Sequence, residues 1–200
     1  MENLQIINCT QGEPEWHSAR IGCLTASCYS QILAKGKGLT RRSYMMKIAG
    51  ERITGNAAES YTNPHMERGK EQESAARELY VAQSGLEVIE CGFMKRGNIG
   101  YSPDGLIGED GLLEIKTKLA HLQAEVLLDD KIPSEHIAQI QGGLMVSGRQ
   151  WLDFVSYCPG MPLFIKRVER DEAYIQTLTD ELAKFEAELS QVVTQLMSKF

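Results

Sequence analysis

Residues 101–118 of the chain read YSPDGLIGEDGLLEIKTK. The part from Leu112 to Lys118 follows a glycine-rich turn and predicts a β-strand. Because strand side chains alternate between two faces, Glu114 and Lys116 project together, whereas the apolar or nearly apolar Leu113, Ile115 and Thr117 point to the other face. The turn between Gly105 and Gly111 is placed to bring Asp104 back beside Glu114. The stretch thus predicts two carboxylates and a lysine on one face of a sheet.

Two close carboxylates repel one another and raise each other's pKa unless a cation sits between them. Hard oxygen ligands of this kind suit Mg²⁺ or Mn²⁺. Such an ion can orient a phosphodiester and activate water, and Lys116 adds a point charge that can position the attacking water. The alternative is structural: Pro103-Asp104-Gly105 is only a turn, and Glu114 and Lys116 form a surface pair.

A third carboxylate is indicated by the phase of a predicted helix over residues 67–83. At about 100° per residue, one sector of this helix holds an apolar set: Met66, Gly69, Ala76, Leu79 and Tyr80. Glu73 lies at the edge of that sector, whereas Glu67, Glu71 and Glu78 lie on the opposite side. Glu73 is therefore expected to face the core, where an acid needs a partner such as a metal or its water. The alternative partner is Arg77, one turn further on.

The same phase argument applies to a predicted helix over residues 134–146. Gln141 falls beside the apolar stripe of Ile137, Ile140 and Leu144, so it is expected to reach a site. Gln139 falls on the far side and is expected to be out of reach.

The remaining sequence alternates helical and strand patterns. Further helices are expected at about 13–20, from Thr25, at 41–53 and, long and amphipathic, at 171–197; further strands are expected at 86–94, 99–101, 151–157 and 164–169. The order predicts an α/β (α+β) fold with a central mixed β-sheet flanked by helices. Residues 1–200 are expected to form one domain, with N-terminal helices over 13–84, a sheet core over 86–170 and a C-terminal helix over 171–198.

Composition is that of an ordinary soluble globular protein, with 42% hydrophobic and 24% charged residues among 200. No apolar run approaches the roughly 18 residues of a membrane span, and no signal peptide is evident. The five cysteines are scattered, which favours reduced thiols in a cytoplasm. The net charge of −6 counts mildly against nucleic acid, but bound cations would offset carboxylates, and basic residues cluster in the stretch KGKGLTRR at 35–42.

Several short motifs occur in a fixed order along the chain. They are Gln11-Gly12, Trp16-His17, Arg20, Gly22, Thr25-Ala26-Ser27, Gly69-Lys70 with Glu73, Ser102-Pro103-Asp104-Gly105, Glu114-Ile115-Lys116 and Ala138-Gln139-Ile140-Gln141. Together these motifs resemble the phage lambda exonuclease family, or YqaJ-type viral recombinases, within the PD-(D/E)XK nuclease superfamily. The resemblance covers about residues 11–151, and the entry to the last helix at 169–171 is also similar. Residues 35–62 do not align firmly.

The resemblance implies a restriction-endonuclease-like core and a Mg²⁺-dependent exonuclease, with two ions per site and Mn²⁺ as a possible substitute. It implies that one strand of a DNA duplex is degraded 5′→3′ from a 5′-phosphorylated end. Carried over by position, Asp104, Glu114, the backbone carbonyl of Ile115 and Glu73 are metal ligands, and Lys116 is the catalytic lysine. The residues expected to hold the 5′-terminal phosphate are Arg20, Ser27, Ser102 and Gln141.

The resemblance also implies partners: a homotrimeric ring around DNA and a single-strand annealing protein for recombination in the bacterial cytoplasm. Met66 falls where the family places an apolar residue near the point of strand separation. The alternatives are a PD-(D/E)XK endonuclease or repair nuclease without end dependence, an iron–sulfur exonuclease, and a non-catalytic subunit that binds DNA ends. An iron–sulfur cluster needs four cysteine ligands in a pattern that this chain lacks, and the intact Asp104, Glu114 and Lys116 argue against the non-catalytic subunit.

Overall fold

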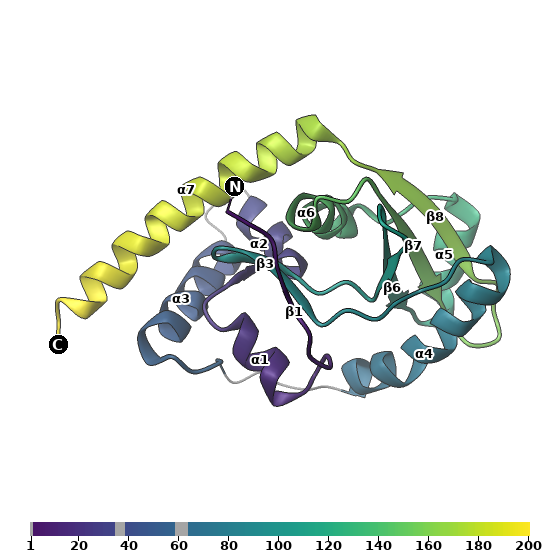
Figure 1. Ribbon diagram of the computed structural model, residues 1–200, viewed down its shortest axis with the longest axis horizontal. Helices are drawn as coiled ribbons and strands as arrows, with labels where there is room; N and C mark the ends of the chain where they lie inside the picture. The colour runs from purple at the N-terminus through teal and green to yellow at the C-terminus, as the bar shows by residue number, and fades with distance from the viewer. Residues whose placement is uncertain (1, 35–38, 59–63) are drawn as a thin grey trace.

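The computed structural model describes residues 2–34, 39–58 and 64–200, and of residues 64–71 only the backbone. In this part of the chain the strands form two four-stranded sheets with helices around them (Figure 1). The mixed α+β class predicted from the sequence is confirmed. The prediction of one central sheet is not, because the strands before residue 102 form a sheet of their own.

The sheet that carries the candidate site has the strand order β5-β6-β7-β8. Its strands are β5 (Gly105–Ile107), β6 (Gly111–Thr117), β7 (Trp151–Tyr157) and β8 (Phe164–Glu169). β6 and β7 are parallel, with Glu114 opposite Phe154, and the other pairs are antiparallel. A parallel pair needs a long crossover connection. Here the crossover contains α5 (Ala120–Asp129), the 3₁₀ turn η2 (Ser134–His136) and α6 (Ile137–Ser147).

The other sheet has the order β1-β3-β4-β2. Its strands are short: β1 (Gln5–Ile7), β2 (Leu24–Thr25), β3 (Phe93–Arg96) and β4 (Ile99–Tyr101). The strand expected over 86–94 is mostly irregular. Only its end belongs to β3, and its earlier part forms one isolated bridge, between Ile89 and Leu106. Ser102 and Pro103 connect β4 to the start of β5, so the chain passes from one sheet to the other directly before Asp104.

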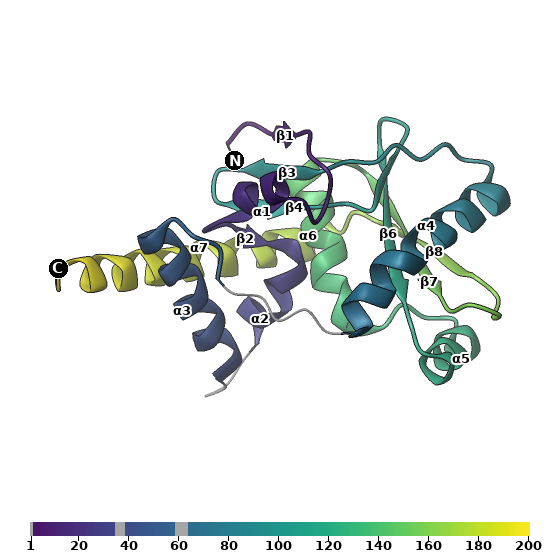
Figure 2. The same cartoon turned by 90° about the horizontal axis from the view of Figure 1, so that it is seen from below.

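Helices cover both faces of the site-bearing sheet (Figure 2). One face packs against α4 (Pro64–Ser84), where Ala76 and Tyr80 meet Leu113 and Ile115. The opposite face packs against α6, through Ile140 and Leu144. Leu79, expected in the buried sector of α4, is 42% exposed, so that part of the phase prediction is wrong. The side chain of Met66 lies outside the described residues.

The remaining helices lie around the short sheet, and most of them contribute to the core that this sheet shares with the α6-covered face of the other sheet. They are α1 (Pro14–Arg20), the 3₁₀ turn η1 (Ala26–Cys28), α2 (Tyr29–Leu33), α3 (Leu39–Thr54) and α7 (Glu172–Met197). α7 buries Leu178, Leu182 and Phe185 in this core, and its C-terminal end extends beyond the body of the molecule (Figure 1). Among the described residues, no helix is both long enough and apolar enough to cross a membrane.

Candidate functional site

Asp104 lies beside the middle of β6, as the sequence predicts. Its backbone N–H donates to the carbonyl of Leu113 at 3.1 Å, which starts the hairpin. Its carboxylate Oδ2 accepts from the backbone N–H of Ile115 at 2.6 Å. The turn after Pro103 therefore brings Asp104 next to Glu114, on the neighbouring strand.

Glu114 is a buried carboxylate with three polar partners. Its side chain is 2% exposed, and the ammonium of Lys116 lies 2.6 Å from Oε1. Gln139 Nε2 donates to the same oxygen, and the hydroxyl of Tyr101 donates to Oε2 at 2.7 Å. Glu114 and Lys116 thus share a face of β6, while Leu113 and Ile115 pack toward α4. The predicted alternation is confirmed, but Glu114 is not part of an exposed surface pair.

The acids strongly influence one another. Burial raises the pKa of Asp104 well above its usual range, and the charges of Glu114 and Glu73 raise it further, against the opposing charge of Lys116. For Lys116, burial alone would lower the pKa, but Glu114 and Asp104 outweigh it and the pKa is raised. Lys116 is therefore held as a cation among acids that repel each other.

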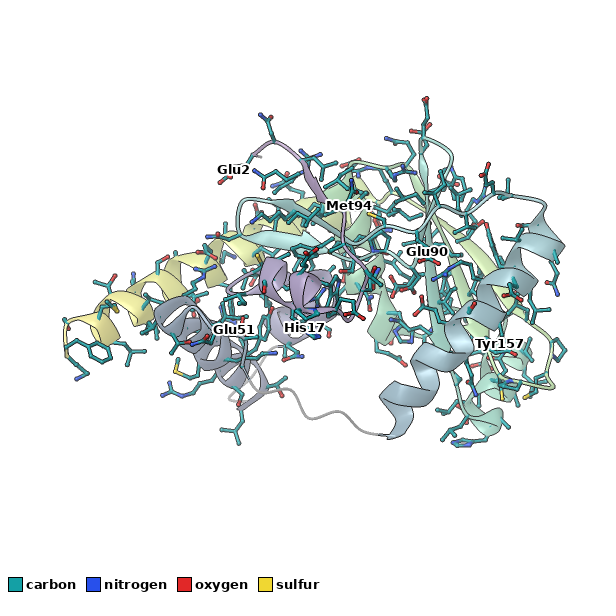
Figure 3. All side chains as sticks on the ribbon, turned by 60° about the horizontal axis from the view of Figure 1, so that its bottom comes forward. Glu2, His17, Glu51, Glu90, Met94 and Tyr157 are labelled. Atoms are coloured by element: carbon teal, nitrogen blue, oxygen red, sulfur yellow. The ribbon has the colours of Figure 1, made fainter. Side chains whose placement is uncertain are left out.

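Glu73 of α4 is half-buried and contributes to this cluster. Burial raises its pKa, and Glu114 adds to the rise against the opposing charge of Arg77. Arg77 lies 2.6 Å from Glu73 and 2.5 Å from the exposed Glu90, which is labelled in Figure 3. The ion pair with Arg77, the alternative considered from the sequence, is therefore present. Glu73 and Asp104 nevertheless line the same pocket, so this ion pair is compatible with a metal role for Glu73.

The donor set has the chemistry of a Mg²⁺ or Mn²⁺ site. Asp104, Glu114 and Glu73 supply hard oxygen atoms, whose mutual repulsion a divalent cation would relieve. Within the described residues, no three carboxylate, imidazole or thiol groups already converge as a metal-binding group. Instead Lys116 and Arg77 pair with Glu114 and Glu73. The residue types fit the ion, and binding it would exchange these ion pairs for metal contacts.

A pocket of about 210 Å³ adjoins the carboxylates. Arg20, at the end of α1, donates through Nη1 to Ser102 Oγ at 3.0 Å, and its guanidinium carbon stacks 4.0 Å from the ring centre of Trp16. Trp16 Nε1 donates to the same Ser102 oxygen at 2.8 Å. These bonds use the lone pairs of Ser102, which leaves its O–H to donate to an anion. Trp16 belongs to one of the sequence motifs but had no predicted role; its position one turn before Arg20 was the available signal.

The pocket brings together most of the residues that the sequence suggested for phosphate binding. Its lining comprises Gln11, Trp16, Arg20, Thr25, Ala26, Ser27, Tyr101, Ser102, Asp104, Glu114, Lys116 and Gln139. Ser27 is exposed, with its Oγ 3.4 Å from Thr25 Oγ1. Burial lowers the pKa of Arg20. A larger pocket of about 650 Å³ continues from it toward Glu73 and Arg77, and the two share Gln11, Trp16 and Asp104.

The two glutamines of α6 are the reverse of the prediction. Gln139 lines the pocket and contacts Glu114. Gln141 is buried elsewhere: it donates to the carbonyl of Glu169 at 2.9 Å and accepts from the backbone N–H of Asp171 at 3.0 Å. The phase argument was wrong because α6 is buried on nearly all sides, so its apolar stripe marks no single inward face.

The sequence profile of the YqaJ-like viral recombinase domain matches residues 15–150. The chain belongs to this family. No curated protein matches the chain by sequence. This YqaJ-like chain is 36% identical to LHK-Exo, an alkaline exonuclease from Laribacter hongkongensis, whose crystal structure matches with a TM-score of 0.86 over 94% of this chain and 97% of that one.

The structure of LHK-Exo in complex with dAMP matches with a TM-score of 0.88, at the same identity and coverage. A phage-related exonuclease from Haemophilus somnus 129PT matches with a TM-score of 0.66 over 87% of this chain and 96% of that one. At 14% identity, the Haemophilus somnus structure supports only the fold of this chain.

Proposed function

We propose that this YqaJ-family nuclease is a Mg²⁺-dependent exonuclease that degrades one strand of duplex DNA 5′→3′ from a 5′-phosphorylated end. The observation that carries the proposal is the single small pocket shared by Arg20, Ser102, Asp104, Glu114 and Lys116. A space of about 210 Å³ is large enough for a phosphate group. A terminal phosphate held by Arg20 would place the next phosphodiester of the strand toward the carboxylates.

The side chains of the site have two tasks: some bind the terminal phosphate, and others take part in cleavage of the phosphodiester bond. Arg20 presents a planar fork to phosphate oxygens, and the stacked indole of Trp16 fixes its orientation. The hydroxyls of Ser27 and Ser102 and the amide of Gln139 add neutral donors. Lys116 holds its positive charge next to Glu114, where it can orient the attacking water and stabilise the negative charge that develops on the phosphoryl oxygens.

Asp104, Glu114 and the carbonyl of Ile115 would hold Mg²⁺, or Mn²⁺ in its place, and Glu73 would reach a second ion or its water. When bound, such ions supply an activated water and neutralise charge on the phosphate. Neither group of side chains suffices alone: the carboxylates repel an anion, and Arg20, Ser27 and Ser102 would bind the phosphate but supply no metal ligands.

Cleavage in this geometry regenerates the preferred substrate. Hydrolysis that releases the terminal nucleotide with its phosphate leaves the next phosphate on the 5′ end of the shortened strand. That end carries the group that the Arg20 pocket accepts. Repeated cleavage is therefore expected without a second enzyme that prepares the end.

The proposal extends to recombination by single-strand annealing, which requires a resected 3′ strand. A homotrimeric ring around DNA, a single-strand annealing protein as partner and a bacterial cytoplasmic location all follow from the family resemblance. The described cysteines are free thiols, which is compatible with a reducing compartment. An endonuclease or repair nuclease without end dependence is the competing function, and it has no use for a pocket that binds a terminal phosphate.

The proposal is tested with linear and covalently closed circular duplexes of one sequence, each with Mg²⁺ and with EDTA. The linear substrate carries either a 5′-phosphate or a 5′-hydroxyl, and a label at the 5′ or 3′ terminus reports polarity. We expect mononucleotide release from the 5′ end of the linear phosphorylated duplex with Mg²⁺ only. Cleavage of the closed circle at a comparable rate would establish the endonuclease instead.

A further inference from the structure

Tyr101 belongs to β4 of the short sheet, whereas Glu114 belongs to β6 of the site-bearing sheet. Tyr101 directly precedes Ser102, Pro103 and Asp104 in the chain. Its ring is buried, with 1% exposure. Its hydroxyl donates to Glu114 Oε2 at 2.7 Å, so one hydrogen bond joins the two sheets at the candidate site. The same short segment therefore positions a carboxylate at each end: Asp104 through the backbone and Glu114 through the Tyr101 hydroxyl.

α6 fixes the position of the Tyr101 ring. A Cβ built at Gly143 would lie 2.8 Å from ring atoms of Tyr101, so the ring rests directly on the helix backbone, where only glycine leaves room. A ring held in this way has little freedom to move its hydroxyl. The hydrogen bond from this hydroxyl therefore fixes the position of Glu114 Oε2.

We propose that Tyr101 is a positioning residue for the metal site: it holds one oxygen of Glu114 so that the other faces Lys116, Gln139 and the pocket. The inference rests on the proposed metal-dependent function and adds a residue to it. Without the hydroxyl, Oε2 is buried with no donor, and the carboxylate must turn to find one. Glu114 then presents its oxygens to a cation in a less defined orientation.

The chain contains a matched control. Tyr80 of α4 is also fully buried, and its hydroxyl donates to a buried carboxylate, Oδ2 of Asp153, at the same distance of 2.7 Å. Asp153 lies on β7 and pairs with Arg167, and neither Tyr80 nor Asp153 lines the pockets at the candidate site. Tyr80→Phe therefore deletes a hydrogen bond of the same length without touching Glu114, and Asp153 Oδ2 keeps Nη2 of Arg167 as a donor.

The experiment compares wild type, Tyr101→Phe and Tyr80→Phe in three measurements: Mn²⁺ binding by calorimetry, Kd for 5′-phosphorylated duplex in EDTA, and kcat against metal concentration. We expect Tyr101→Phe to weaken Mn²⁺ binding and raise the half-saturating metal concentration about tenfold, the loss typical of a hydrogen bond to a charged group. Its DNA affinity is expected to be unchanged. Tyr80→Phe is expected to match wild type in all three measurements.

Gly143→Ala provides a second variant, because its added Cβ presses on the Tyr101 ring and keeps the hydroxyl. It is expected to weaken Mn²⁺ binding in the same direction. If wild type binds no Mn²⁺ and cleaves without metal, the proposed function fails and this inference with it. If wild type binds Mn²⁺ and Tyr101→Phe binds it equally well, the inference about Tyr101 alone is overturned.

Discussion

The ammonium nitrogen of Lys116 lies 2.6 Å from Oε1 of Glu114, two residues earlier on the same strand. The carboxylate is buried and the lysine is partly exposed, with side-chain exposures of 2% and 28%. This ion pair therefore sits at the boundary between the core and the pocket. It gives Glu114 a partner at a depth where an unpaired charge would be costly, and it presents a cation to any phosphate that enters.

The first prediction concerns the residues that would carry the chemistry. Asp104→Ala, Glu114→Ala and Lys116→Ala are each expected to abolish hydrolysis, because metal binding and charge stabilisation both depend on this set. DNA binding is expected to survive, since contacts from Arg20 and other basic groups are independent of it. Single-turnover cleavage rates and fluorescence anisotropy with a labelled duplex in EDTA separate the two effects. Glu109→Ala, at an exposed turn between β5 and β6, is the control.

Cleavage by any of the three variants within about tenfold of wild type would contradict its catalytic role. Loss of DNA binding together with cleavage, in protein that remains folded by circular dichroism, would instead mean that the residue contributes to affinity.

The second prediction distinguishes two acids on α4. Glu73 is half-buried and its charge raises the pKa of Asp104. Glu78, about one and a half turns further on, is exposed. Glu73→Ala is therefore expected to lower kcat by about a hundredfold or more, as for a group that acts in proton transfer or through a metal. Glu78→Ala is expected to leave kcat unchanged. Equal effects would assign Glu73 to its structural ion pair with Arg77.

The third prediction follows from the reversed glutamines of α6. Gln139→Ala is expected to lower the rate on phosphorylated ends about ten- to a hundredfold, the range for one hydrogen bond to a charged group. Gln141→Ala is expected to keep the wild-type rate but to lower the free energy of unfolding by about 1–3 kcal/mol, because its partners at residues 169 and 171 are left unpaired. Chemical denaturation and rate measurements on both variants check this. The opposite pattern would restore Gln141 to the pocket.

Local periodicity predicted three of the four strands of the site-bearing sheet, whereas β5 fell inside the stretch that was expected to be a turn. The expected bounds 151–157 and 164–169 agree with β7 and β8, because apolar and β-branched residues run between turn signals there. The predicted alternation of side chains around Glu114 is also confirmed. β6 is buried on both faces, so packing fixes the face to which each of its side chains points. The placement of Asp104 followed from the glycine-rich turn.

Other features left no local signal. β1 and β2 have three and two residues, too few to show a period, and their pairing with β3 and β4 depends on contacts distant in sequence. α5 was missed because it begins after Leu119, which provides no side-chain cap, and it carries no marked stop. Likewise, the shared acceptor of Trp16 and Arg20 lies more than eighty residues away in sequence, at Ser102.

The most direct measurement of the central claim is the rate of Arg20→Ala and wild type on duplexes that differ only in a 5′-phosphate or a 5′-hydroxyl. The account predicts that the variant loses about 2–3 kcal/mol of transition-state stabilisation on phosphorylated ends, roughly thirty- to two-hundredfold, and almost nothing on hydroxyl ends. Arg41→Ala, whose guanidinium pairs with Glu188 of α7, is expected to keep the wild-type preference. A full 5′-phosphate preference in Arg20→Ala would contradict the account.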